Sequence, residues 1–125
     1  MSTVTTVLLI EADRNWQNII WANINDEYIQ IVAVPAVEEA LQILADVARH
    51  IDVVVVSDVT RGNVSRFIDL VGAIRRRFAG TIFAIGDNFP GRDVLSQAGC
   101  EYYVCKSHLA KALNGFYCPV GTATV

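Results

Sequence analysis

The stretch Asp52-Val53-Val54-Val55-Val56-Ser57-Asp58 decides the fold, because four consecutive valines end on a hydroxyl and a carboxylate. A run of β-branched residues without polar alternation is typical of a parallel strand that helices cover on both faces. Ligands of open parallel sheets bind just beyond the carboxyl ends of such strands. The stretch therefore predicts a central strand, with Ser57 and Asp58 where a functional site is expected.

The rest of the chain repeats this arrangement of a strand followed by a helix. Apolar runs alternate with segments whose apolar residues recur every three or four positions, as on one face of a helix. Strands are expected at 7–10, 28–34, 52–57, 81–85 and 101–105. Helices are expected from Asp13 to Ile24, from 37 to 48, from 67 to near Gly80, at 93–98, and from Leu109 until Gly115 and Pro119 cut the last one short.

Five such units predict an α/β fold with a parallel sheet. Right-handed crossovers leave few topologies, and the flavodoxin-like (βα)5 arrangement, with strand order 2-1-3-4-5 and helices on both faces, is the commonest at this length. The 125 residues predict a single domain, with a core at about 4–114 and a short tail at 115–125 that carries no output domain.

Composition narrows the class of protein. Hydrophobic residues make up 53% and charged residues 18%, which indicates strands buried on both faces and excludes a disordered chain. The net charge of −3 predicts no general attraction to nucleic acid or to an anionic membrane. Arg75-Arg76-Arg77 is the local exception, and we interpret it as a solvated helix end.

Cellular location is predicted from the cysteines and the N-terminus. Cys100, Cys105 and Cys118 are odd in number and lack zinc-ligand spacing, so they are expected to be reduced thiols of a cytoplasmic protein. Residues 1–6 have no positive charge and no cleavage site that would direct secretion. No apolar run is long enough to cross a bilayer.

In the predicted strand order, several polar residues converge on one crevice at the carboxyl edge of the sheet. They are Glu11, Asp13, Ser57, Asp58, Gly86 and Lys106. No glycine-rich phosphate loop follows the first strand, which argues against a nucleotide site of the usual kind.

Acids after strand one, an acid after strand three and a lysine after strand five make the chain resemble the receiver domain of bacterial two-component response regulators. The resemblance covers residues 4 to about 114. Three segments carry it: Leu8-Leu9-Ile10-Glu11-Ala12-Asp13, Val37-Glu38-Glu39-Ala40-Leu41, and Gln97-Ala98-Gly99-Cys100-Glu101-Tyr102-Tyr103-Val104-Cys105-Lys106.

The resemblance implies a specific chemistry. In the family, a histidine kinase or a small phosphodonor transfers a phosphoryl group to an aspartate, while acids hold Mg²⁺ and a lysine completes the clamp. A threonine or serine after strand four and an aromatic on strand five then move toward the phosphate, which changes the surface that a partner recognises.

This chain departs from the family pattern at several positions. Glu11 takes the first acidic position, but Ala12 stands at the second, and Asp13 is the neighbouring acid that could substitute. Counting five residues from Asp52 puts Ser57 at the phosphoacceptor position and Asp58 one place beyond it. A buried valine strand does not fix its own register, and a bulge would bring Asp58 in, so both residues remain candidates.

Further departures affect the switch. Gly86 replaces the hydroxyl residue after strand four, and Ser107 replaces the proline that normally follows the lysine. Lys106 and the aromatic Tyr103 remain. Without an acidic acceptor beside it, Lys106 is expected to form a structural ion pair with Asp58 or Glu11.

These losses favour a degenerate, pseudo-receiver-like domain that is not an enzyme, needs no cofactor and works through protein contacts. Its partner would be a histidine kinase or a downstream regulator. A homodimer is also compatible, through the face formed by helix four, strand five and helix five. The aromatic residues Phe89, Tyr102, Phe116 and Tyr117 are either part of that contact face or a cover for the sheet edge.

Two alternatives keep the fold. In the first, the domain is phosphorylated on Asp58, and Glu11, Asp13 and Asp58 hold Mg²⁺. In the second, the chain is a small flavodoxin-like enzyme or nucleotide binder. His50 and His108 are the only histidines. His50 precedes strand three, at the wrong end of the sheet for catalysis, and His108 is best explained as a helix-start residue.

Overall fold

The computed structural model describes residues 4–57 and 63–119. Strands and helices alternate along these residues, as predicted. The strands are β1 (Thr5–Ile10), β2 (Ile29–Val34), β3 (Val53–Ser57), β4 (Thr81–Gly86) and β5 (Tyr102–Cys105). The helices are α1 (Arg14–Asn23), α2 (Val37–Ala45), α3 (Val64–Arg75), α4 (Arg92–Ala98) and α5 (Leu109–Tyr117), with a 3-10 turn (Lys106–His108) before α5.

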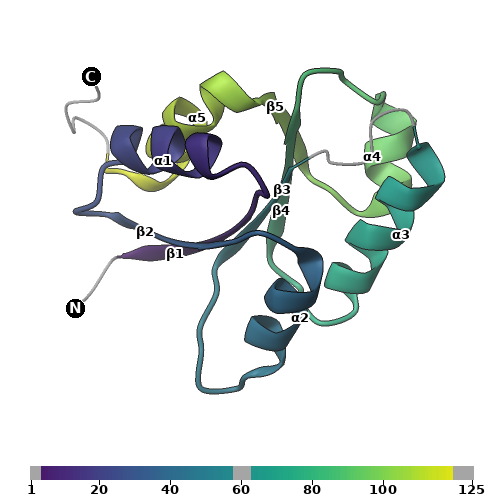
Figure 1. Cartoon of the computed structure of the whole chain (residues 1–125), viewed down its shortest axis with the longest axis horizontal. Coiled ribbons are helices and arrows are strands. Elements are labelled where there is room, and N and C mark those ends of the chain that lie inside the picture. The colour runs from purple at the N-terminus through teal and green to yellow at the C-terminus, as the bar shows by residue number, and fades with distance from the viewer. Residues whose placement is uncertain (1–3, 58–62, 120–125) are drawn as a thin grey trace.

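The five strands form one parallel sheet in the order β2-β1-β3-β4-β5, which confirms the predicted flavodoxin-like α/β fold. Helices α1 and α5 cover one face of this sheet, and α2, α3 and α4 cover the other (Figure 1). In the part of the chain that the structure describes, no helix is both long and apolar enough to span a membrane.

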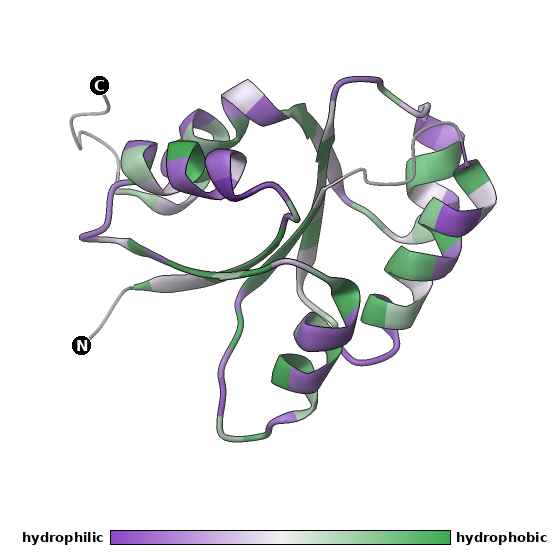
Figure 2. Cartoon of the chain, in the orientation of Figure 1, coloured by the Kyte–Doolittle hydropathy of each residue, from purple (hydrophilic) through white to green (hydrophobic). Residues whose placement is uncertain are grey.

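The valine run supplies both halves of the core. Val54 and Val56 pack toward α2, α3 and α4, whereas Val53 and Val55 pack toward α1 and α5, because successive strand residues point to opposite faces. All four side chains are at most 1% exposed. Hydrophobic colouring accordingly follows the strands, while most loops are hydrophilic (Figure 2). Burial on both faces is the reason for a strand without polar alternation.

Helix α5 is longer than the sequence predicts, since it runs through Gly115 to Tyr117 instead of ending there. Asn114, the residue before Gly115, is buried and joins α5 to the end of α1. Its side-chain amide donates to the Asn23 carbonyl at 3.0 Å and accepts from the Asn25 N–H at 2.9 Å. These contacts offset the roughly 1 kcal/mol that glycine costs inside a helix. The segment expected to be a tail from residue 115 is therefore helical as far as Tyr117.

The turn between α3 and β4 brings the backbone unusually close at Gly80. A Cβ atom at this position would lie 2.9 Å from the Asp52 carbonyl oxygen and 2.5 Å from Cζ of Phe78. Only glycine leaves room for this approach, which sets the start of β4 beside that of β3. Helix α3 itself ends at Arg75, before the predicted boundary near Gly80.

The three cysteines are free thiols with different environments, which gives a direct chemical test of the fold. Burial raises the pKa of the Cys100 thiol to about 12, with a further increase from Glu101 that Arg75 partly opposes. Cys105 is exposed. Because the thiolate is the nucleophile, iodoacetamide at about pH 9 is expected to alkylate Cys105 first and Cys100 last, as followed by peptide mass spectrometry.

The same pKa shift predicts the direction of a pH effect on stability. Since the folded-state pKa lies above the ordinary value of 9.0, Cys100 stabilises the fold fully below that value, and this contribution is lost as the pH rises toward about 12.

Unfolding in urea provides the control for the alkylation experiment, because all three thiols should then react alike. Equal labelling of Cys100 and Cys105 in the folded protein would contradict the burial.

Candidate functional site

A buried ion pair lies at the carboxyl edge of the sheet, between the segments that follow β1 and β5. Nζ of Lys106 is 2.8 Å from Oε1 of Glu11, and the two side chains are 16% and 2% exposed. The contact falls outside hydrogen-bond geometry, but the Coulomb attraction of the ammonium still compensates the buried oxygen. Lys106 therefore forms the expected structural ion pair, and its partner is Glu11.

The other groups around Glu11 also stabilise its position. Its second carboxylate oxygen, Oε2, accepts a hydrogen bond of 3.0 Å from the Asp13 backbone N–H. Its carbonyl oxygen accepts from Nε2 of Gln17 at 2.6 Å. The Trp16 ring lies under the lysine, with its centroid 5.7 Å from Nζ, which is a cation–π distance. Both Glu11 carboxylate oxygens therefore have a cationic or N–H partner within the chain.

Sequence reasoning missed Trp16 and Gln17 as site residues. Both lie half-buried in α1, where Trp16 contacts Lys106 and Gln17 contacts Glu11. A polar residue in the first turn of a helix, six positions after Glu11, gives no periodic signal that separates it from a surface residue.

Asp13 serves a local structural purpose. Its Oδ1 accepts a hydrogen bond of 2.9 Å from the Asn15 N–H, so the carboxylate caps the N-terminus of α1. The side chain is exposed, and so is Ala12 before it. Asp13 thus contributes its backbone N–H to Glu11, while its carboxylate is engaged at the helix end.

The described side chains do not form a Mg²⁺ site. Such a site needs several oxygen ligands in near-octahedral geometry. Residues 4–57 and 63–119 contain no cluster of three or more His, Cys, Asp or Glu side chains that could hold a metal ion. Glu11 is paired with Lys106 and Asp13 caps α1, so the described part of the predicted ligand set does not fit the ion; its third member, Asp58, lies outside the described residues.

Ser57 is the last residue of β3 and is 2% exposed. By alternation it points to the same side as Val53 and Val55, toward α1 and α5, and Glu11 follows Val7 and Leu9 on that side. Its hydroxyl oxygen has no hydrogen-bond partner among the described residues. A buried hydroxyl therefore lies at the end of the central strand, on the face that carries Glu11. Asp58, the other acceptor candidate, is outside the described residues.

The two expected switch positions lie on neighbouring strands. Gly86 is buried at the end of β4 and pairs in register with Cys105. Tyr103 is half-buried on the face of α4; its hydroxyl donates to the Asn88 carbonyl at 2.7 Å, and its ring meets that of Phe89 edge-on at 5.6 Å. Tyr103 is thus joined to the loop between β4 and α4, whereas Gly86 offers no hydroxyl.

The histidines lie away from these groups or at the surface. His50 is at the amino end of β3, opposite to the crevice, where Nε2 is 2.6 Å from Oδ1 of Asp52. His108 is exposed in the 3-10 turn after β5. Neither position provides a base beside the buried Ser57 hydroxyl, as the enzyme alternative requires.

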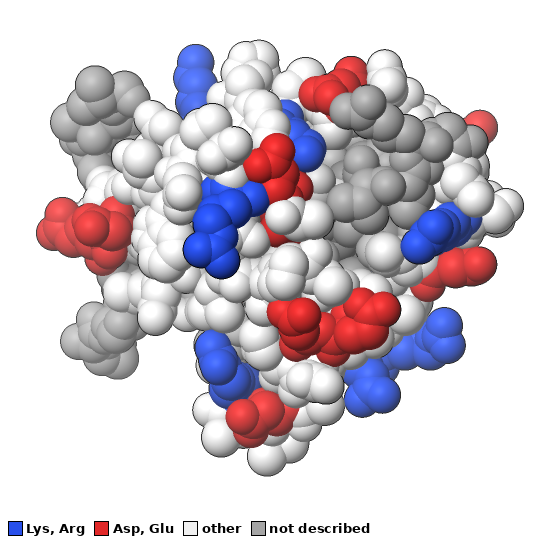
Figure 3. All heavy atoms as spheres, in the orientation of Figure 1, with Lys and Arg blue, Asp and Glu red and all other residues white. Residues whose placement is uncertain are grey.

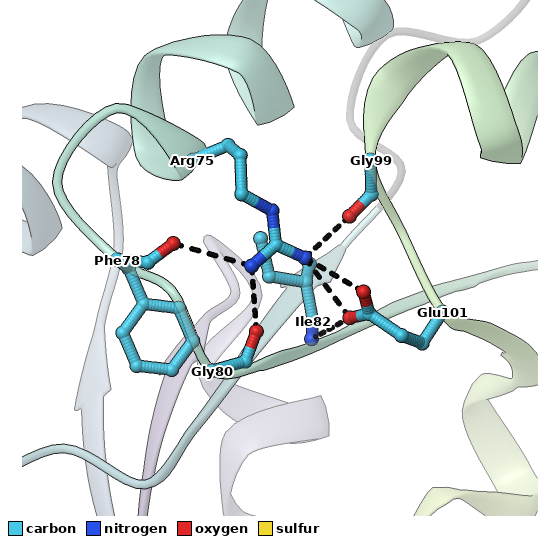
Figure 4. A network of polar contacts seen from close by, with 6 residues as sticks. All are labelled: Arg75, Phe78, Gly80, Ile82, Gly99 and Glu101. Atoms are coloured by element: carbon cyan, nitrogen blue, oxygen red, sulfur yellow. Dashed lines mark hydrogen bonds and ion pairs between the residues drawn. The ribbon is translucent and has the colours of Figure 1, made fainter.

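Arg75 is a second ion-pair centre, and its role differs from the solvated helix end expected for the arginine run. Its guanidinium donates to the carbonyl oxygens of Phe78, Gly80 and Gly99 at 3.2, 2.6 and 2.5 Å. It also pairs with both Glu101 carboxylate oxygens at 2.9 and 3.0 Å, and Glu101 accepts from the Ile82 N–H at 2.7 Å (Figure 4). The interpretation as a solvated end is therefore wrong for Arg75, while Arg76 and Arg77 are exposed.

Comparison with known proteins finds similarity at the level of structure. No protein-family model matches the chain, and no curated protein matches its sequence significantly. A two-component response regulator from Clostridium difficile superposes with a TM-score of 0.70 at 17% identity, over 90% of this chain and 91% of that one. An orphan response regulator of H. pylori has a TM-score of 0.68 at 18% identity, over 92% and 98%.

A response regulator protein from Thermotoga maritima, solved in complex with Mg²⁺-BeF, gives a TM-score of 0.69 at 20% identity, over 90% and 96%. These matches include nearly the whole length of both chains in each pair. At such identities the similarity concerns the fold. The chain thus has the fold of response-regulator receiver domains.

Proposed function

We propose that this chain is a receiver-like signalling domain of a two-component or phosphorelay pathway that works through protein–protein contacts and does not depend on phosphorylation. The observation that carries the proposal is the buried Glu11–Lys106 ion pair at 2.8 Å. In phosphoryl transfer, acids hold the metal and the lysine meets the incoming phosphate. Here the acid and the lysine neutralise each other.

The remaining positions support the same conclusion. Asp13 caps α1, the Ala12 side chain has no atom that can ligate a metal, and Gly86 has no hydroxyl that could move toward a phosphate. We place Ser57 at the acceptor position. A serine phosphoester is chemically inert compared with an acyl phosphate, so Ser57 would not provide a rapidly reversible switch.

The contact surface that we propose comprises α4 with the loop before it, β5 and α5, and it exposes the aromatic residues Phe89, Tyr102 and Phe116. Exposed aromatic residues are enriched at protein interfaces. On the face shown in Figure 3, basic and acidic side chains are mixed, without the continuous basic patch of a nucleic-acid-binding protein. The partner would be a histidine kinase or a downstream regulator in the cytoplasm, and the domain itself would catalyse no reaction.

Treatment with acetyl phosphate and Mg²⁺ tests this proposal by intact mass spectrometry. We expect no phosphate-sized mass gain, and no retention of beryllofluoride under the same conditions. The matched variants are Asp58→Asn and Ser57→Ala. A mass gain that Asp58→Asn abolishes would establish the alternative, a phosphorylatable receiver with Asp58 as acceptor, and would overturn the proposal.

A further inference from the structure

A cleft lies between α4 and β5, and the loop before α4 contributes to its lining. Its volume is about 620 Å³, within the range of roughly 300–1,000 Å³ that is usual for small-molecule sites. The buried side chains of Leu95 and Cys100 belong to the lining, together with the exposed Arg92 and Ser96 of α4. The cleft thus joins a buried apolar part to a polar part that is open to solvent.

Three aromatic rings also line the cleft. Phe89, in the loop before α4, is 60% exposed and meets the Tyr103 ring edge-on at 5.6 Å. Tyr102 is 41% exposed. Exposed rings of this kind pair favourably with another aromatic ring, in offset-stacked or edge-to-face arrangements. The lining therefore favours a ligand with a planar aromatic body.

The charges at the cleft leave one cation without an acidic partner. Glu101 lines the cleft, but both of its carboxylate oxygens bond to Arg75, and one also accepts from the Ile82 N–H (Figure 4). Within residues 4–57 and 63–119, the Arg92 side chain has no ion pair or hydrogen bond, and Asp93 beside it does not line the cleft. The charge left for a ligand is therefore positive.

The size of the cleft argues for a small molecule rather than a partner helix. A docked helix uses apolar anchors at positions i, i+3 or i+4, and i+7, which requires a groove about two turns long. The residues of α4 that line the cleft run from Arg92 to Ser96. At a rise of about 1.5 Å per residue, they span about 6 Å along the helix. This length suits one ring system.

We infer that the cleft binds a small aromatic anion of the aryl carboxylate class. The rings of Phe89 and Tyr102 contact the planar body of the ligand, and the Arg92 guanidinium donates forked, charge-assisted hydrogen bonds to its carboxylate. The inference rests on the proposed function in its consequence alone. Because Phe89 and Tyr102 belong to the proposed contact surface, a bound ligand would cover part of that surface and regulate partner binding.

Titration of the full chain with cinnamate tests the inference, with amide chemical shifts measured by NMR. Cinnamamide is the matched neutral ligand, because it has the same aromatic body without the charge. We expect saturable cinnamate binding, with the shift changes concentrated at residues 88–103. Cinnamamide should bind about tenfold more weakly, since it lacks the charge-assisted contact with Arg92.

Two substitutions separate the role of the charge from that of the rings. Arg92→Gln should weaken cinnamate binding about tenfold and leave cinnamamide binding unchanged. Phe89→Ala should weaken the binding of both ligands. The matched controls are Arg66→Gln on α3 and Trp21→Ala on α1, which change an exposed arginine and an exposed aromatic residue outside the cleft. Both controls should bind as the wild type does.

All four substituted side chains are exposed, and circular dichroism establishes that each variant is folded. The inference would be overturned by the absence of saturable cinnamate binding, by equal affinity for the acid and the amide, or by binding that neither cleft substitution weakens. Each of these results would leave the proposed function in place. Conversely, an acyl phosphate on Asp58 would contradict the proposed function and leave the ligand site in place.

Discussion

Replacing Lys106 with alanine is expected to lower the free energy of unfolding by about 3 kcal/mol, because it leaves the Glu11 carboxylate buried without its cation. Glu11 is 2% exposed, and among the described residues the remaining partner of its carboxylate is the Asp13 N–H. Urea unfolding followed by circular dichroism measures the change. This is one of the two largest effects that we predict for a single substitution.

Lys111→Ala is the matched control, since this lysine is exposed on α5 and its removal should change stability by at most about 0.5 kcal/mol. The double variant Glu11→Gln, Lys106→Met removes both charges and should recover most of the loss. If Lys106→Ala were as stable as Lys111→Ala, the ion pair would have no structural role.

Replacing Arg75 with alanine is expected to cost about 3 kcal/mol, because one guanidinium serves three carbonyl oxygens and a carboxylate. The substitution would leave the Glu101 carboxylate without its ion-pair partner and would separate the end of α3 from the start of β5. Arg75→Lys should recover only part of the loss, since an ammonium cannot reproduce the planar fork of donors. Thermal and urea unfolding both report the effect.

Arg77→Ala provides the control for Arg75, because it removes an exposed arginine two residues away in the same basic run. Its effect should be within about 0.5 kcal/mol of zero. Equal losses in the two variants would show that the network drawn in Figure 4 does not stabilise the protein.

The sheet could be predicted from sequence because its signals are local and repeated. Four valines require burial on both faces, and strands that alternate with helices allow few topologies, so the order of the strands and the position of Lys106 near Glu11 followed directly. Helix ends were less predictable. Gly115 has a real helix-breaking tendency, but the buried Asn114 anchors α5 to α1 and the helix continues.

The polar networks could not be predicted, because they depend on side-chain directions that no periodicity records. Arg75 and its exposed neighbour Arg77 look alike in the sequence, yet only Arg75 reaches the carbonyl oxygens of two separate loops. Gln17 has no sequence signal that separates it from a surface residue, yet it donates to the carbonyl oxygen of Glu11. The choice between Ser57 and Asp58 remains a prediction, because an all-valine strand carries no alternation that would fix its register.

The central claim is that the ion pair of Lys106 and Glu11 takes the place of a metal site, and calorimetric titration of the full chain with Mg²⁺ tests it most directly. We predict no saturable binding, for the wild type and for Asp58→Asn alike. Stoichiometric Mg²⁺ binding by the wild type that Asp58→Asn or Glu11→Gln abolishes would contradict the account.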